Sequence, residues 1–268
     1  MRNTAGHLVP LIKRAEAIAN YLEVEHWSNP PQIGETRDIN RQQIAPQGDN
    51  NDPEREKFIM PELNDAFKKT KTGKEPGPDN IRMELLSWLS PQNRELLLET
   101  INVWWITKQS PKELYFAKVA TIFKKGDTDK ASNYRPISLL SSFYKLYMIL
   151  IRERIQSKLE PLVSDTQYGF RPAKSTSHAT FILRRIQEFS ESSGSPLYLT
   201  LLDWEKAFDK VDHQCLCHVL ERFGIHKDTI EVLKEGYEQA TFFVEYQFGK
   251  SETKTQQSGI RQGCPSPP

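Results

Sequence analysis

Apolar residues recur every three or four positions along much of the chain, and short polar breaks separate these stretches. That period predicts amphipathic helices. Ser90 and Ser175 suit the capping position before a helix, and Pro61 and Pro91 suit a first turn. The pattern predicts helices over residues 8–27, 60–71, 81–89, 91–105, 143–159, 176–189, 213–223 and 227–238.

Five other stretches have the character of strands. Residues 116–123 and 133–138 read as two strands joined by a turn, and 241–246 with 253–257 as a hairpin. Residues 197–202 form a near-continuous apolar run, which is typical of a strand buried on both faces. Helices mixed with strands in this order predict an α+β fold.

The apolar run ends on an acidic residue, Asp203. A carboxylate at the tip of a buried strand costs desolvation energy unless positive charge offsets it, and a divalent cation in a cleft is one such source. The alternative is an acid that caps the following helix. The stretch alone leaves both interpretations open.

Apolar content collapses between residues 28 and 56, where Pro, Gln, Gly, Asn and Asp dominate. We expect a disordered linker there. The predicted organisation is an N-terminal amphipathic helix (1–27), the linker (28–56), a helical region (57–115) and a mixed α+β part (116–268).

Composition limits the possibilities only loosely. The 268 residues allow one large domain or two small ones, and a net charge of +1 argues neither for nor against nucleic acid. No apolar run has membrane-spanning length and the N-terminus lacks the apolar core of a signal peptide, so we expect an intracellular protein without a membrane partner, nuclear or cytoplasmic. Three cysteines without framework spacing are expected to be reduced thiols.

Several groups of polar or aromatic residues can have either a structural or a functional role. The stretch from His213 to His218 holds two His and two Cys, but on a helix these fall on two faces, so we expect core-filling cysteines rather than a zinc site. Trp104 and Trp105 suit core positions better than base stacking. The basic side of the 143–159 helix could be solvated surface or part of a nucleic-acid track, and we favour surface.

Six segments, in order, resemble the motifs of reverse transcriptases from LINE-type (non-LTR) retrotransposons. They are "KEPGPDNI" (74–81), "IFKKGD" (122–127), "NYRPISLL" (133–140), "QYGFRP" (167–172), "LDWEKAFDKVDH" (202–213) and "GIRQGCP" (259–265). The resemblance spans about residues 57–268. It implies the fingers and part of the palm of a right-hand polymerase. Family members usually have glycine where Asn80 stands, and Asn tolerates the positive φ that such a loop needs.

The resemblance also implies roles for individual residues. Guanidinium binds phosphate bidentately, which makes Arg135 the strongest candidate for the nucleotide triphosphate. Glu205, Asp209 and Asp212 are expected to be surface or capping groups. The implied nucleotide-binding residues are Lys124, Lys125, Arg135, Phe208 and Gln262, the template-binding residues are Phe170, Arg171 and Gly263, and the catalytic metal-binding groups are Asp203 and the Trp204 carbonyl. The implied cofactor is Mg²⁺, and the implied partners are an RNA template, a DNA primer and deoxynucleoside triphosphates.

The family's second carboxylate motif, aromatic-x-Asp-Asp, occurs nowhere in the 268 residues. The resemblance therefore suggests a chain truncated before that motif, because two Mg²⁺ ions need more than one carboxylate. Three functions compete: a reverse transcriptase domain that is inactive as this chain, a non-catalytic nucleic-acid-binding remnant, and a helical interaction module based on the N-terminal helix.

Overall fold

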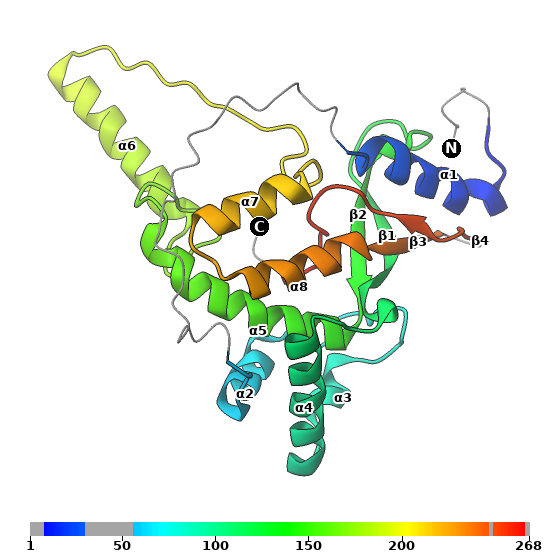
Figure 1. Cartoon of the computed structure of the whole chain (residues 1–268). Coiled ribbons are helices and arrows are strands. Elements are labelled where there is room, and N and C mark those ends of the chain that lie inside the picture. The colour runs from blue at the N-terminus through cyan, green and yellow to red at the C-terminus, as the bar shows by residue number, and fades with distance from the viewer. Residues whose placement is uncertain (1–7, 30–55, 247–248, 266–268) are drawn as a thin grey trace.

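A computed structural model describes residues 8–29, 56–246 and 249–265 of the chain. Eight α-helices and five strands lie within them (Figure 1). The helices are α1 (Arg14–Tyr21), α2 (Met60–Lys69), α3 (Met83–Ser87), α4 (Pro91–Thr107), α5 (Ser142–Leu159), α6 (Thr176–Ser193), α7 (His213–Arg222) and α8 (Lys227–Glu238). The strands are β1 (Phe116–Phe123), β2 (Tyr134–Leu140), β3 (Thr241–Tyr246), β4 (Gly249–Lys250) and β5 (Lys254–Thr255).

The sheet is mixed, with the order β2-β1-β3-β4 and with β5 also paired to β3. β1 and β2 are antiparallel, whereas β1 and β3 run parallel. β4 and β5 both pair antiparallel with β3, so the returning arm of the predicted 241–257 hairpin is split into two short strands. The α+β class is therefore confirmed.

Local signals predicted most helices well. Ser90 accepts a hydrogen bond from the Asn93 amide at the start of α4, as expected of a cap, and Pro91 occupies the first turn. Asn80 has φ +57°, the conformation anticipated for that loop position. The helix predicted over 81–89 is shorter, and Asp79 accepts a hydrogen bond from the Ile81 amide in a turn before it.

One core runs through the described residues. Aromatic side chains form much of it, and Trp105 is 1% exposed, as the core interpretation of the tryptophans required. Phe58 lies against Trp105 with ring centroids 5.2 Å apart, and Trp27 meets Phe242 edge-on at 4.8 Å.

The N-terminal helix is part of this core. α1 packs on β3 and β4 (Figure 1), and Ile18 and Leu22 are fully buried there. The segment predicted as a separate helix therefore completes the packing of the sheet. Most of the predicted linker, residues 30–55, lies outside the described residues.

The strand predicted over 197–202 is wrong. The segment is extended but pairs with no strand among the described residues, and Leu201 and Leu202 are 89% and 81% exposed. β3 already pairs with β1 on one side and with β4 and β5 on the other. Residues 197–202 therefore have no free edge of β3 to pair with. An apolar run becomes a strand only where another strand satisfies its backbone groups.

α6 is a helix at the predicted place, but none of its residues is buried. It projects from the body of the molecule, and residues 194–204 return from its far end toward α7 (Figure 1). Phe181 and Phe189 are 64% and 73% exposed, which leaves its apolar side facing solvent together with the 197–202 segment.

Candidate functional site

Three of the sequence motifs meet at the segment 259–263. The Ser138 amide of β2 donates to the Gln262 carbonyl (2.8 Å), and the Ile260 amide donates to the Phe208 carbonyl (2.8 Å). Gly263 has φ +118°, and a Cβ there would lie well inside van der Waals contact with the Ser138 carbonyl oxygen. Only glycine fits such an approach, so the glycine holds two motifs together.

The same segment is held by His213, one of the residues in the His/Cys cluster. Its Nε2 lies 2.9 Å from the Gly259 carbonyl oxygen, and its ring stacks on Tyr237 with centroids 4.2 Å apart. Burial lowers the pKa of His213 below its usual range, which favours the neutral ring. Cys215 lies exposed on α7 while Cys217 is half-buried.

The predicted triphosphate residues lie together at the tip of the β1–β2 hairpin. Lys124 and Lys125 follow β1, and Arg135 lies opposite Ile122 in the register. All three are exposed, and within the described ranges none forms an ion pair with a carboxylate. Cations left unpaired in this way are available to an anionic ligand.

Asp203 and Trp204 lie on the exposed segment that leads to α7, and Trp204 is 79% exposed. Among the residues that the structure describes, no group of three His, Cys, Asp or Glu side chains lies close enough to hold a metal ion. One carboxylate and one carbonyl on an unpaired segment do not make the octahedral oxygen cage that Mg²⁺ requires. The described residues alone therefore do not fit the ion.

Phe208 and Phe170 come from different motifs and meet in space. Their rings lie edge to face with centroids 5.6 Å apart, and Phe170 remains 76% exposed. The nearby Arg171 is held by the segment that follows α5: it pairs with Glu160 (2.7 Å) and donates to the Ser164 carbonyl (2.7 Å). A phosphate would have to compete with Glu160 for this guanidinium.

Asp209 departs from the sequence-based expectation of a surface or capping group. It is 7% exposed, lies 3.4 Å from His26 Nε2, and receives the Gln262 side-chain amide at 3.4 Å. Burial raises its pKa, but the nearby polar groups of His26, Trp27 and Gln262 outweigh burial and lower it overall. Asp212, in contrast, caps α7 by accepting from the Cys215 amide, as expected.

Asp209 is thus a residue whose role the sequence did not reveal. It connects the N-terminal segment, through His26, to Gln262, a predicted nucleotide-binding residue. Lys210 adds a second connection, donating to the Glu25 carbonyl at 2.8 Å. No local pattern signals these contacts, because the partners lie at opposite ends of the chain.

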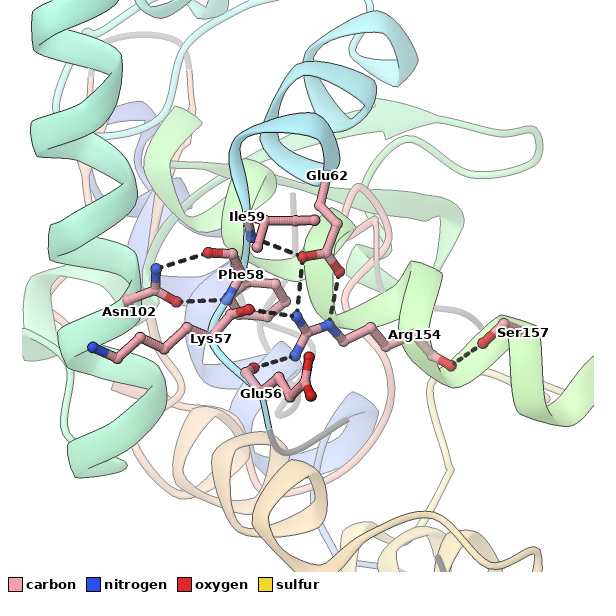
Figure 2. A network of polar contacts seen from close by, with 8 residues as sticks. All are labelled: Glu56, Lys57, Phe58, Ile59, Glu62, Asn102, Arg154 and Ser157. Carbon is pink, nitrogen blue, oxygen red and sulfur yellow. Dashed lines mark hydrogen bonds and ion pairs between the residues drawn. The ribbon is translucent and has the colours of Figure 1, made fainter. Parts of the chain in front are cut away.

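Arg154 on α5 is neither simple surface nor part of a nucleic-acid track. Figure 2 shows its guanidinium bridging Glu62 and the backbone ahead of α2. It donates to both Glu62 carboxylate oxygens (2.9 and 3.0 Å) and to the Glu56 carbonyl (2.7 Å), and it stacks 4.0 Å from the Phe58 ring centroid. Asn102 holds the Phe58 backbone amide and carbonyl from α4.

Comparison with known proteins identifies the family. The reverse transcriptase (RNA-dependent DNA polymerase) family matches residues 122–268. The chain belongs to this family. Membership of this family implies a fingers and palm architecture for the matched part.

The relatives are proteins of non-LTR retrotransposons. The chain is 30% identical over 212 residues to the transposon TX1 uncharacterized 149 kDa protein of Xenopus laevis, an alignment covering 78% of this chain and 16% of that protein. It is 28% identical over 207 residues to a probable RNA-directed DNA polymerase from transposon BS of Drosophila melanogaster (75% and 22% covered). It is 27% identical over 212 residues to the RNA-directed DNA polymerase from mobile element jockey of Drosophila funebris (76% and 22%).

The chain therefore spans about a fifth of the length of these relatives. No helix in the described part of this reverse transcriptase chain has the length and apolar character needed to cross a membrane.

Proposed function

We propose that this chain forms the nucleotide- and template-binding part, fingers and partial palm, of an RNA-directed DNA polymerase of a LINE-type retrotransposon. The observation that carries the proposal is the meeting of three motif segments at residues 259–263. In a polymerase these segments must converge, because template, primer and nucleotide meet at one reacting phosphate.

In this proposal the exposed hairpin tip binds the nucleotide triphosphate. Lys124, Lys125 and Arg135 supply its charge, and the last binds phosphate oxygens through two parallel donors. Phe208 and Gln262 contact the sugar of the nucleotide, and their backbones are held together through Ile260.

In this proposal the RNA template lies next to Gly263, on the side away from the nucleotide. Phe170 presents an exposed ring for base stacking, and Gly263, whose backbone packs against Ser138, lies beside the strand. Arg171 contacts phosphate only if it exchanges Glu160 for the template. A DNA primer completes the set of partners.

Asp203 and the Trp204 carbonyl would contribute one side of a Mg²⁺ site, which in this family supplies the electrostatic stabilisation of phosphoryl transfer. The other carboxylates belong to the aromatic-x-Asp-Asp motif, which the 268 residues do not contain. We therefore propose that this polypeptide alone does not extend a primer.

An alternative function is a non-catalytic, nucleic-acid-binding remnant of a transposable element. The exposure of the Asp203 segment, which pairs with no strand in the described part of the chain, favours this alternative. Genomic sequence after the codon for Pro268 would separate the two, because a frame encoding the missing motif favours the polymerase.

The direct experiment is extension of a labelled DNA primer on an RNA template with Mg²⁺ and deoxynucleotides. We expect no product from the 268-residue polypeptide. Template-dependent incorporation that disappears in Asp203→Ala would overturn this part of the proposal.

A further inference from the structure

A cavity of about 610 Å³ lies beside Gly263, on the side of β2 away from the core. Its walls come from the end of α2 with the loop 70–76, from β2, from the first turns of α5, and from residues 263–265. Three motif segments thus surround it: the loop before residue 81, β2 and the 259–265 segment. The volume lies in the range of ligand-binding clefts.

The cavity is strongly cationic. Its lining holds one acidic residue, Glu75, and five basic residues: Lys69, Lys71, Lys74, Lys145 and Arg152. Lys69 and Arg152 share the carboxylate of Glu153 from α5. The other three lysines form no ion pair with any described residue.

Of the three unpaired lysines, Lys145 is half-buried, whereas Lys71 and Lys74 are exposed. Burial lowers the pKa of Lys145 below the usual range of lysine, and attraction from Asp79 only partly offsets the effect. A half-buried ammonium without a paired carboxylate is stabilised by an anion that enters the cavity. Arg152 carries a buried Nε without a protein partner at the same wall.

The walls of the cavity are fixed before any ligand binds. A Cβ on Gly77 would lie 2.5 Å from the backbone of Leu140 and Ser141, so the loop packs directly on the end of β2. Ser142 donates to the Ile81 carbonyl at 2.7 Å. The Arg154 contacts in Figure 2 hold the start of α2, whose far end carries the lysine wall.

The cavity continues from the proposed nucleotide residues. Residues 135, 137 and 139 share one face of β2, because side chains alternate along a strand. Arg135 lies at the open end of this face, and Ile137 and Leu139 line the cavity about 7 to 13 Å further along. The cavity therefore adjoins the proposed nucleotide site, as a template site must, because template and nucleotide meet at one reacting phosphate.

From this arrangement we infer that the cavity binds the phosphate backbone of single-stranded RNA next to Gly263, through Lys71, Lys74 and Lys145. The inference rests on the proposed function, since it assigns phosphate contacts to the template of that site. The chemistry favours a polyanion with apolar bases, because the lining holds three unpaired lysines together with apolar side chains that include Ile137, Leu139 and Met83.

The test is a titration of a labelled, unstructured RNA, followed by fluorescence anisotropy between 50 and 300 mM salt. The variant combines Lys71→Ala, Lys74→Ala and Lys145→Ala. The matched control combines Lys112→Ala, Lys227→Ala and Lys234→Ala, which removes the same charge elsewhere. Each single-strand phosphate contact contributes about 0.7 to the slope of log K against log salt, so the variant should lose about 2 in slope and roughly a hundredfold in affinity at 0.1 M salt.

A second measurement needs no variant. Lysines of the unaltered polypeptide are acetylated with and without RNA and read by mass spectrometry, and we expect RNA to protect Lys71, Lys74 and Lys145 but not Lys227. Protection by deoxynucleotides alone would make this the triphosphate site and overturn the inference.

The outcomes separate this inference from the proposed function. RNA binding that is salt-sensitive but equally weakened in variant and control overturns the inference and leaves the proposed function standing. Absence of salt-sensitive RNA binding by the unaltered chain overturns both.

Discussion

Replacing Arg154 by Met should destabilise the chain by about 3 kcal/mol. The side chain is 10% exposed and donates to Glu62 twice and to two main-chain carbonyls, those of Glu56 and Lys57. Removing one partner of a buried pair typically costs 3–5 kcal/mol. We take the lower end because the Glu62 side chain is 33% exposed, so water can solvate the carboxylate that remains.

For a protein of this size, 3 kcal/mol lowers the midpoint of thermal unfolding by roughly 6–12 °C. Arg154→Lys keeps the charge but loses the planar fork, so it should recover only part of the loss. Arg185→Met is the matched control, because Arg185 pairs with Glu188 on the surface of α6 with 65% of its side chain exposed. Such exposed pairs contribute at most about 1 kcal/mol.

The assay is urea unfolding followed by far-ultraviolet circular dichroism, with hydrogen exchange over residues 56–62 as a local readout. Equal losses in the free energy of unfolding for Arg154→Met and Arg185→Met would refute the reasoning. The buried guanidinium of Arg154 would then contribute no more stability than a surface ion pair.

Three further results are expected. Gly263→Ala should weaken folding or RNA binding by at least tenfold, because the new Cβ collides with the Ser138 carbonyl; binding and stability equal to the unaltered chain would contradict the assignment. The pKa of Asp209 is lowered in the folded state, so its carboxylate contributes stability that is present above about pH 5 and is lost as pH falls through 3.8 and below. The acid limb of a pH–stability curve should therefore flatten in Asp209→Asn. The exposed apolar 197–202 segment should make the polypeptide marginally stable and prone to associate, so a monodisperse solution with a sharp thermal transition would contradict it.

Helices were predictable from sequence because their signals are local. The Ser90 cap, the Pro91 first turn and the apolar spacing of α5 each act within one turn or one face of the helix. The β1–β2 hairpin was also predictable, because its seven residue pairs join two strands that a short connection separates.

The failures involve partners far away in the chain. Residues 197–202 have the composition of a buried strand, yet burial depends on a neighbouring strand that the described residues do not supply. Asp209 resembles any surface acid in its own stretch, and only folding brings His26 and Gln262 to it. The lysines of the cavity lie on two separate segments, around residues 69–74 and at 145, so no single sequence pattern predicts that they lie together.

The motif residues form an intermediate case. The resemblance placed Gln262 and Gly263 in one segment typical of the reverse transcriptase family, and the structure brings that segment to β2 and to Phe208. What each of these residues contacts during synthesis remains a proposal that binding experiments address.

The most direct test of the account is the salt dependence of affinity for an RNA-containing primer–template. We predict a dissociation constant of ~10⁻⁴ to 10⁻⁶ M at physiological salt that tightens as salt falls. Arg135→Ala with Lys125→Ala should weaken the affinity for a deoxynucleoside triphosphate and flatten its dependence on salt, whereas Arg184→Ala with Lys227→Ala should change it little. Affinity that is indifferent to salt, or equal in the two double variants, would contradict the assignment of this chain as the nucleotide- and template-binding part of a reverse transcriptase.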